Sequence, residues 1–140
     1  MYTGGVVVDN IELLRLAEDA RQHSYAPYSG FRVGAALLTK SGKVYTGCNI
    51  ECASLGGTNC AERTAIFKAI SEGDKDIYKI AIASDNSENN EQTYPCGICR
   101  QVIIEFGSDI KIITGYTKGE VFEHSIKDLL PNYFSGNDLK

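Results

Sequence analysis

The sequence is organised around TNCAERTAIFK (residues 58–68) and a second stretch, YPCGICRQV (residues 94–102). In each stretch we expect a helix whose first turn opens on a cysteine. The two helices would bring together the thiolates of Cys60, Cys96 and Cys99. Three thiolates are one ligand short of the four that a closed structural zinc site requires. The two stretches therefore predict a zinc site with one open position.

Glu62 lies two residues after the first of these cysteines. A carboxylate is a harder ligand than thiolates, so Glu62 is better suited to moving a proton at a water molecule that the metal activates. Helix N-termini directed at the sulfurs would withdraw charge from them. We expect Arg63 to help by donating an N–H to a thiolate. Pro95, directly before Cys96, strengthens the pattern.

Other interpretations of the same residues remain open. Cys96-x-x-Cys99 alone is also compatible with a redox pair or with a non-catalytic zinc module. Such a module predicts a closed site, in which Cys48 or Cys52 would supply the fourth ligand. Glu62 would then have no task, which favours the catalytic interpretation and two additional free thiols.

Length and composition limit the classes of function. With 140 residues, of which 43% are hydrophobic, we expect one domain spanning 1–140. The net charge of −4 without a basic cluster argues against a nucleic-acid groove. There is no apolar run of about 18 residues, the length that a membrane span requires. Residues 1–9 lack the basic region of a signal peptide, and the five cysteines favour metal binding or free thiols, so we expect a cytoplasmic protein.

The hydrophobic pattern predicts an α/β fold. Predicted helices alternate with apolar strand segments, and turn signals such as Ser41-Gly42 lie between them. Asp9 and Glu12 give the first helix an N-cap and a capping box. This order suggests a three-layer α-β-α sandwich with a mixed sheet of about five strands. The expected helices are 9–22, 61–71, 98–106 and 125–130, and the expected strands are 31–39, 43–49, 77–84, 110–114 and 120–123.

Five segments carry a resemblance to a known family. They are YAPYSGFRVGAALL (25–38), GCNIE (47–51), NCAERTA (59–65), PCGICRQ (95–101) and LLP (129–131), which Phe134 follows. As a set they resemble the small, homotetrameric cytidine deaminases over about residues 13–137. The resemblance implies a core sheet between helices and the hydrolytic deamination of cytidine and deoxycytidine to uridine and deoxyuridine, a reaction of pyrimidine salvage.

The resemblance also implies roles for individual residues. Cys60, Cys96 and Cys99 would bind one Zn²⁺ per chain, and Glu62 would carry protons from the attacking water to N3 and to the leaving amine. Phe31 resembles the aromatic residue that packs on the pyrimidine. The remaining substrate contacts would be Asn49 and Glu51 on the sugar hydroxyl, the backbone N–H near Ala61 on the base carbonyl, and Phe134 reaching into the site of a neighbouring subunit.

The chain departs from the family pattern between the sugar-binding segment and the first zinc cysteine. Leu55 stands where many relatives have an aromatic residue, and Cys52 where asparagine is common. Gly56-Gly57 is similar to the blasticidin S deaminases, a sister family, which keeps deamination of an antibiotic nucleoside as an alternative. Editing of nucleic acid is a further alternative, but tRNA adenosine deaminases usually have histidine where this chain has Cys60.

Overall fold

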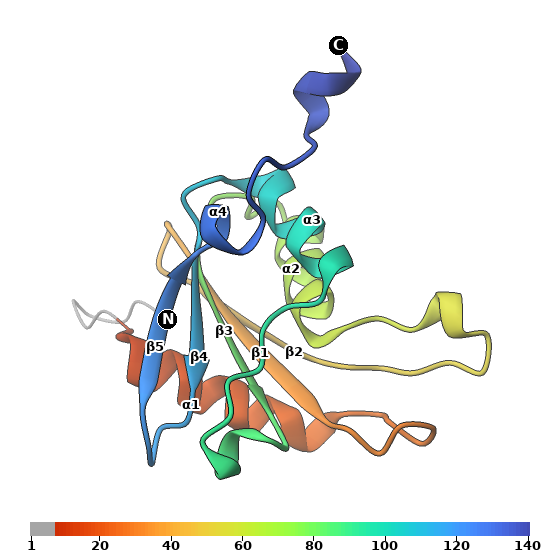
Figure 1. The fold of residues 1–140 in the computed structure, drawn as a ribbon, viewed down its shortest axis with the longest axis vertical. Coiled ribbons are helices and arrows are strands. Elements are labelled where there is room, and N and C mark those ends of the chain that lie inside the picture. The colour runs from red at the N-terminus through yellow and green to blue at the C-terminus, as the bar shows by residue number, and fades with distance from the viewer. Residues whose placement is uncertain (1–7) are drawn as a thin grey trace.

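A five-stranded mixed sheet runs through the structure, a computed structural model that describes residues 8–140 (Figure 1). The strand order is β2-β1-β3-β4-β5, and every neighbouring pair is antiparallel except β3 and β4, which are parallel. Residues 1–7, which include most of the segment used above to argue against a signal peptide, lie outside the described part. The strands are β1 (Val33–Thr39), β2 (Val44–Cys48), β3 (Ile77–Ser84), β4 (Lys111–Gly115) and β5 (Val121–Ser125).

The sheet buries both of its faces, because side chains on each strand alternate between two cores. On β1, Ala35 and Leu37 belong to the core that contains α2 and α3, whereas Ala36 and Leu38 belong to the core that contains α1. This arrangement confirms the predicted α/β sandwich. The helices are α1 (Asn10–Ala20), α2 (Ala61–Ser71), α3 (Gly97–Phe106) and the short α4 (Ile126–Leu129).

Helix α1 begins where the sequence predicts, because the Asp9 carboxylate accepts a hydrogen bond of 2.9 Å from the Glu12 backbone N–H. The second half of the predicted capping box does not form, since the Glu12 carboxylate pairs with Arg15 instead. The helix ends as a 3₁₀ turn at Arg21–His23, one residue beyond the predicted end at residue 22.

Two glycines allow the helices to approach the sheet closely. A Cβ on Gly47 of β2 would lie 2.6 Å from the backbone N of Ala65 in α2. On the opposite face, a Cβ on Gly34 of β1 would lie 2.0 Å from the backbone O of Ala17 in α1. Both positions therefore require glycine, and the close contact at Gly47 helps to fix α2, whose first turn enters the site described next.

Candidate metal centre and active site

Helices α2 and α3 each start at a cysteine. Cys60 is the N-cap of α2, Cys96 is the N-cap of α3, and Cys99 lies one turn into α3. The three Sγ atoms lie within 4.8 Å of one another. The predicted meeting of the three thiols at two helix N-termini is therefore present in the structure.

This set of donors fits a zinc ion. Zinc–thiolate bonds of about 2.3 Å in tetrahedral geometry place two sulfurs about 3.8 Å apart. The Sγ atoms of Cys60 and Cys96 are 3.7 Å apart. Among residues 8–140, Cys48 and Cys52 do not join the group of potential ligands, so it offers three thiols and not four. The geometry agrees with an open site.

The electrostatics of the cluster also favour a cation. The Cys99 thiol and the Arg63 guanidinium lower the pKa of Cys60 to about 5. Hydrogen bonding to Cys60, together with burial, raises the pKa of Cys99. A divalent metal held by the three sulfurs would displace the remaining thiol protons, because zinc binds thiolates. Arg63 Nη2 donates to Cys60 Sγ over 3.2 Å, as the sequence predicted.

Glu62 occupies the first turn of α2 and is only 4% exposed. Burial raises the pKa of this carboxyl group to about 7, because the charged form loses solvation. A pKa near neutrality suits a group that must both accept and release a proton in one catalytic cycle. No side chain of opposite charge holds Glu62 in a salt bridge within the described residues, so its carboxylate remains available.

A cavity of about 300 Å³ opens onto Glu62 and two of the sulfurs. Most of its surface is apolar, with a few polar groups, as is typical of small-molecule sites. Residues from four separate segments of the chain form its walls. They are Ser29, Phe31, Val33, Asn49, Glu51, Thr58, Asn59, Cys60, Ala61, Glu62, Thr93, Tyr94 and Cys96. The cavity thus unites all predicted substrate-contact residues except Phe134.

Asn49 lines the cavity and also holds its wall. Its Nδ2 donates to the backbone O of Phe31 over 2.8 Å, and its Oδ1 accepts from the backbone N–H of Val33 over 2.9 Å. An amide has two N–H donors and an oxygen with two lone pairs. One donor and one lone pair are therefore left for a ligand.

Glu51 is likewise engaged within the chain. Its Oε1 accepts from the backbone N–H groups of Tyr28 and Ser29 at 3.0 and 3.1 Å, and its Oε2 bonds to the Ser29 hydroxyl. The hydrogen bond from the Ser29 side chain contributes most to a lowered pKa of Glu51. Glu51 is therefore an anion fixed at the cavity rim.

Phe134 lies outside this cavity. Its side chain is 57% exposed, and its backbone O accepts a hydrogen bond of 2.8 Å from Gln101 Nε2. Arg100 Nε donates to the backbone O of Pro95, while its Nη1 donates to the backbone O of Leu129. Residues of α3 thus bind the backbone of Pro95, directly before Cys96, and the backbone of the C-terminal segment. That segment extends away from the sheet in Figure 1.

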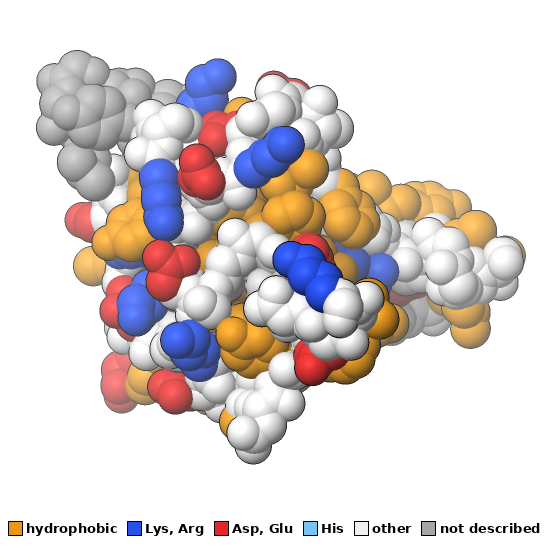
Figure 2. Space-filling view, turned by 90° about the horizontal axis from the view of Figure 1, so that it is seen from above, with side chains coloured by type: hydrophobic (Ala, Val, Ile, Leu, Met, Phe, Trp, Pro, Cys, Tyr) orange, Lys and Arg blue, Asp and Glu red, His pale blue; other side chains and the backbone are white. Residues whose placement is uncertain are grey.

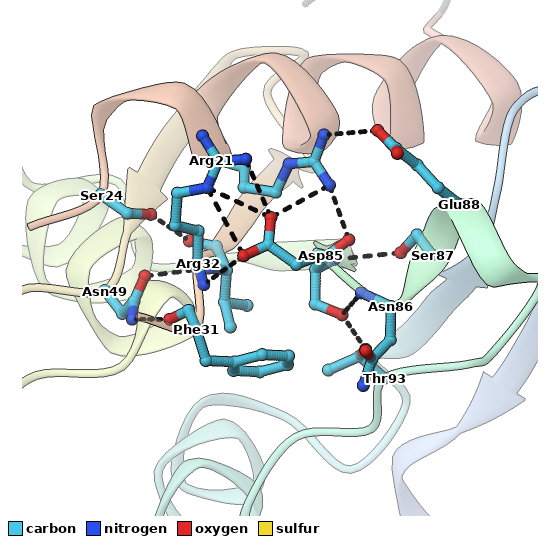
Figure 3. Close-up of polar contacts among 12 residues, drawn as sticks. Arg21, Ser24, Phe31, Arg32, Asn49, Asp85, Asn86, Ser87, Glu88 and Thr93 are labelled. Carbon is cyan, nitrogen blue, oxygen red and sulfur yellow. Dashed lines mark hydrogen bonds and ion pairs between the residues drawn. The ribbon is translucent and has the colours of Figure 1, made fainter. Parts of the chain in front are cut away.

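Sequence reasoning missed several residues of the site. Thr93 and Tyr94 both line the cavity. Thr93 lies in a polar segment with no predicted role, and Tyr94 begins the stretch 94–102, in which only Pro95 and the cysteines were assigned a role. The Tyr94 ring packs against His124 of β5, with ring centroids 5.2 Å apart. Figure 3 shows another missed group, in which Arg21 and Asp85 form an ion pair beside Arg32, the residue that follows Phe31. Only the three-dimensional fold brings these positions together.

Comparison with known proteins gives consistent matches. Residues 8–115 match the family model described as the cytidine and deoxycytidylate deaminase zinc-binding region. A cytidine deaminase from Halalkalibacterium halodurans is 47% identical over 133 residues, which cover 94% of this chain and 98% of that protein. The crystal structure of cytidine deaminase from Burkholderia pseudomallei superposes with a TM-score of 0.80 at 45% identity, covering 87% of this chain and 96% of that one. A blasticidin-S deaminase from Bacillus cereus is 29% identical, covering 98% of this chain and all of that protein.

Proposed function

This chain belongs to the cytidine and deoxycytidylate deaminase family, and we propose that Glu62 performs the proton transfers of its reaction. The chain catalyses the zinc-dependent deamination of cytidine, in which water replaces the amino group and ammonia is released. The observation that carries the proposal is the buried carboxylate of Glu62 in the wall of a cavity that Cys60 and Cys96 also line.

Zinc, held by Cys60, Cys96 and Cys99, supplies the Lewis acid that makes water nucleophilic at neutral pH. Glu62 accepts a proton from the attacking water. It delivers this proton to N3 of the pyrimidine, then takes the second proton from the hydroxyl that has formed on C4 and passes it to the amine, which leaves as ammonia. The burial that raises the pKa of Glu62 lowers the cost of holding this proton between the two steps. Arg63 stabilises the Cys60 thiolate in the meantime.

The substrate is held by the remaining cavity residues. The Phe31 ring packs against the pyrimidine, and the backbone N–H of Ala61, in the first turn of α2, binds the base carbonyl. Asn49 and Glu51 bind the sugar hydroxyl. Asn49 keeps one donor and one lone pair for this purpose, and Glu51 presents an anionic acceptor. Nothing in this set requires a ribose 2′-hydroxyl, so deoxycytidine is also a substrate.

The charge of the cavity predicts which nucleosides react. Among the described lining residues none is basic, and Glu51 is anionic. A 5′-phosphate is therefore repelled, and we expect kcat/KM for CMP to be at least roughly tenfold below that for cytidine. An ultraviolet assay run side by side on cytidine, deoxycytidine, CMP and blasticidin S measures this directly.

Two further measurements sharpen this test. Glu51→Gln should increase the ratio of CMP to cytidine turnover, because it removes the repelling charge while keeping the size of the side chain. Equal turnover of CMP and cytidine by the unmodified protein would contradict the proposed pocket. Blasticidin S turnover above that of cytidine would favour the sister family, to which the match is weaker at 29% identity against 47%.

We also propose that the active protein is a homotetramer in which Phe134 enters a neighbour's cavity. Phe134 is exposed and lies outside the cavity of its own chain. Ile98 and Phe67, on helices α3 and α2, are 62% and 46% exposed. Hydrophobic side chains also interrupt the charged ones on the face seen in Figure 2. Exposed apolar surface of this kind is typical of subunit contacts.

Replacing Phe134 by alanine tests this arrangement. Loss of a stacking partner for a base costs about 1–3 kcal/mol, so KM for cytidine should rise roughly 5- to 150-fold, with little change in the unfolding temperature. Leu139→Ala, which removes another exposed apolar side chain of the C-terminal segment, is the control and should leave KM unchanged. Sedimentation at assay concentration gives the assembly state, and a fully active monomer would contradict the proposal.

We place the protein in the cytoplasm. None of the five cysteines, all within residues 8–140, forms a disulfide, as expected of a reducing compartment. Within residues 8–140 no helix combines the length and apolar character needed to cross a membrane.

A further inference from the structure

The backbone around Phe31 is held by the residues that directly follow the two neighbouring strands, Asn49 after β2 and Asp85 after β3. On the β2 side, Asn49 bonds to the backbone O of Phe31 and to the backbone N–H of Val33. On the β3 side, the Asp85 Oδ2 accepts from the backbone N–H of Arg32 over 2.9 Å, and the Asp85 N–H donates to the backbone O of Arg32 over 3.1 Å. The backbone of Phe31, Arg32 and Val33 is thereby fixed across the start of β1, whose first residue is Val33.

Asp85 is fixed in turn by two arginines (Figure 3). Arg32 Nε donates to its Oδ1 over 3.1 Å. Arg21, at the end of α1 and with a side chain only 8% exposed, places Nη1 at 3.5 Å from the same oxygen and donates to the backbone O of Ser84 over 2.8 Å. Partial burial would raise the pKa of Asp85, but the hydrogen bonds from Arg32 outweigh it and lower that pKa. Asp85 is therefore a fixed anion.

The same end of β3 supports a second wall of the cavity. Ser84 Oγ and Thr93 Oγ1 form a hydrogen bond of 2.5 Å, and Thr93 lines the cavity. In Figure 3 the Phe31 ring extends toward the side of the site where Thr93 lies. Ser84 and Asp85 thus set the positions of two cavity walls that come from distant parts of the sequence.

We propose that Asp85, held by Arg21, is a positioning residue for substrate binding, which sets the Phe31 ring at the separation from Thr93 that a pyrimidine requires. Asp85 does not line the cavity itself, so it acts through Phe31. The inference rests on the proposed function, because it takes the Phe31 ring as the surface on which the base packs. It predicts an effect on substrate affinity that is separate from the effect on stability.

Asp85→Ala removes the hydrogen bond between the Arg32 backbone N–H and the Asp85 carboxylate, together with the ion pairs to Arg21 and Arg32. The bond from the backbone N–H of residue 85 to the Arg32 backbone O remains. KM for cytidine should rise roughly three- to tenfold, while kcat at saturation changes less than about twofold, because Glu62 and the zinc ligands are not displaced. Asp85→Asn keeps an acceptor for the Arg32 N–H and should give a smaller rise. The asparagine variant also serves where the alanine variant fails to fold. Asp109→Asn, which breaks an exposed ion pair with Lys40, is the matched control and should leave KM unchanged.

A double-mutant cycle with Phe31→Leu separates the positioning role from a purely structural one. When the Phe31 ring is already absent, removing Asp85 should raise KM by less than about twofold. The inference would be overturned if the KM increase of the double variant equalled the product of the two single increases. It would also be overturned if the Asp85 variants had a lower unfolding temperature but an unchanged KM. If Phe31→Leu alone leaves KM unchanged, the role of Phe31 in the proposed function fails instead.

Discussion

Replacing Glu62 by glutamine should reduce kcat for cytidine by roughly 10²- to 10⁴-fold and leave the fold and the zinc content intact. The amide has nearly the same shape as the carboxylate, but it cannot accept a proton from water or deliver one to N3. Glu62 is 4% exposed, so bulk solvent cannot easily replace it as the proton carrier. The ultraviolet assay gives the rate, and atomic absorption gives the zinc content of the same sample.

Glu72→Gln provides the control for this substitution. Glu72 follows the last residue of the same helix and is exposed, so the same chemical change there should leave both readings unaltered. Near-normal turnover of the Glu62 variant would remove this residue from the mechanism. Loss of zinc in that variant would instead assign Glu62 to holding the metal.

Replacing Cys99 by alanine should remove zinc and reduce turnover to background. Cys99 is fully buried and its Sγ lies within 4.8 Å of the other two, so a group from solvent cannot easily take its place as a ligand. Two remaining thiolates leave the metal with half of its preferred donors, and a site of this kind loses most of its affinity. Zinc per chain and cytidine turnover, measured on one preparation, should fall together.

X-ray absorption of the unmodified protein completes this test. Three sulfurs and one lighter atom around zinc are expected, as the open site requires. Four sulfurs would contradict it and would favour the non-catalytic module with Cys48 or Cys52 as the fourth ligand. Cys52→Ala is the control, because Cys52 is exposed and lies outside the thiol cluster, and it should retain both zinc and turnover.

The local parts of the site could be predicted from the sequence. Cys60 and Cys96 each begin a helix, as their positions in the sequence indicated. Arg63 lies one turn after Cys60, and this spacing allows its guanidinium to reach the Cys60 thiol. Apolar, β-prone segments and the turn signals beside them likewise predicted the strands of the sheet, with boundaries that differ from the structure by at most two residues. These features depend on periodicities of a few residues, which a single sequence records directly.

The start of β1 could not be predicted, because distant side chains decide it. The apolar pattern suggested a strand from Phe31, yet β1 begins at Val33. Before that point the backbone of Phe31 and Arg32 bonds to the side chains of Ser29, Asn49 and Asp85 and to the Asp85 N–H. The buried position of Arg21 has the same origin. The sequence predicted only that Arg21 belongs to the first helix. The packing of α1 against β1 and β3 is what brings its guanidinium to Asp85.

The three thiols of the cluster come from helices that precede and follow β3 in the sequence, which has a consequence for the newly made chain. Cys60 and Cys99 are 39 positions apart, and β3 and the turn of α3 must be synthesised between them. At about 5–20 residues per second, Cys60 leaves the ribosome roughly two to eight seconds before its last partner. During that interval its thiol has no metal site to join. We therefore expect zinc to enter near the end of folding, after the hairpin of β1 and β2 has closed its short loop.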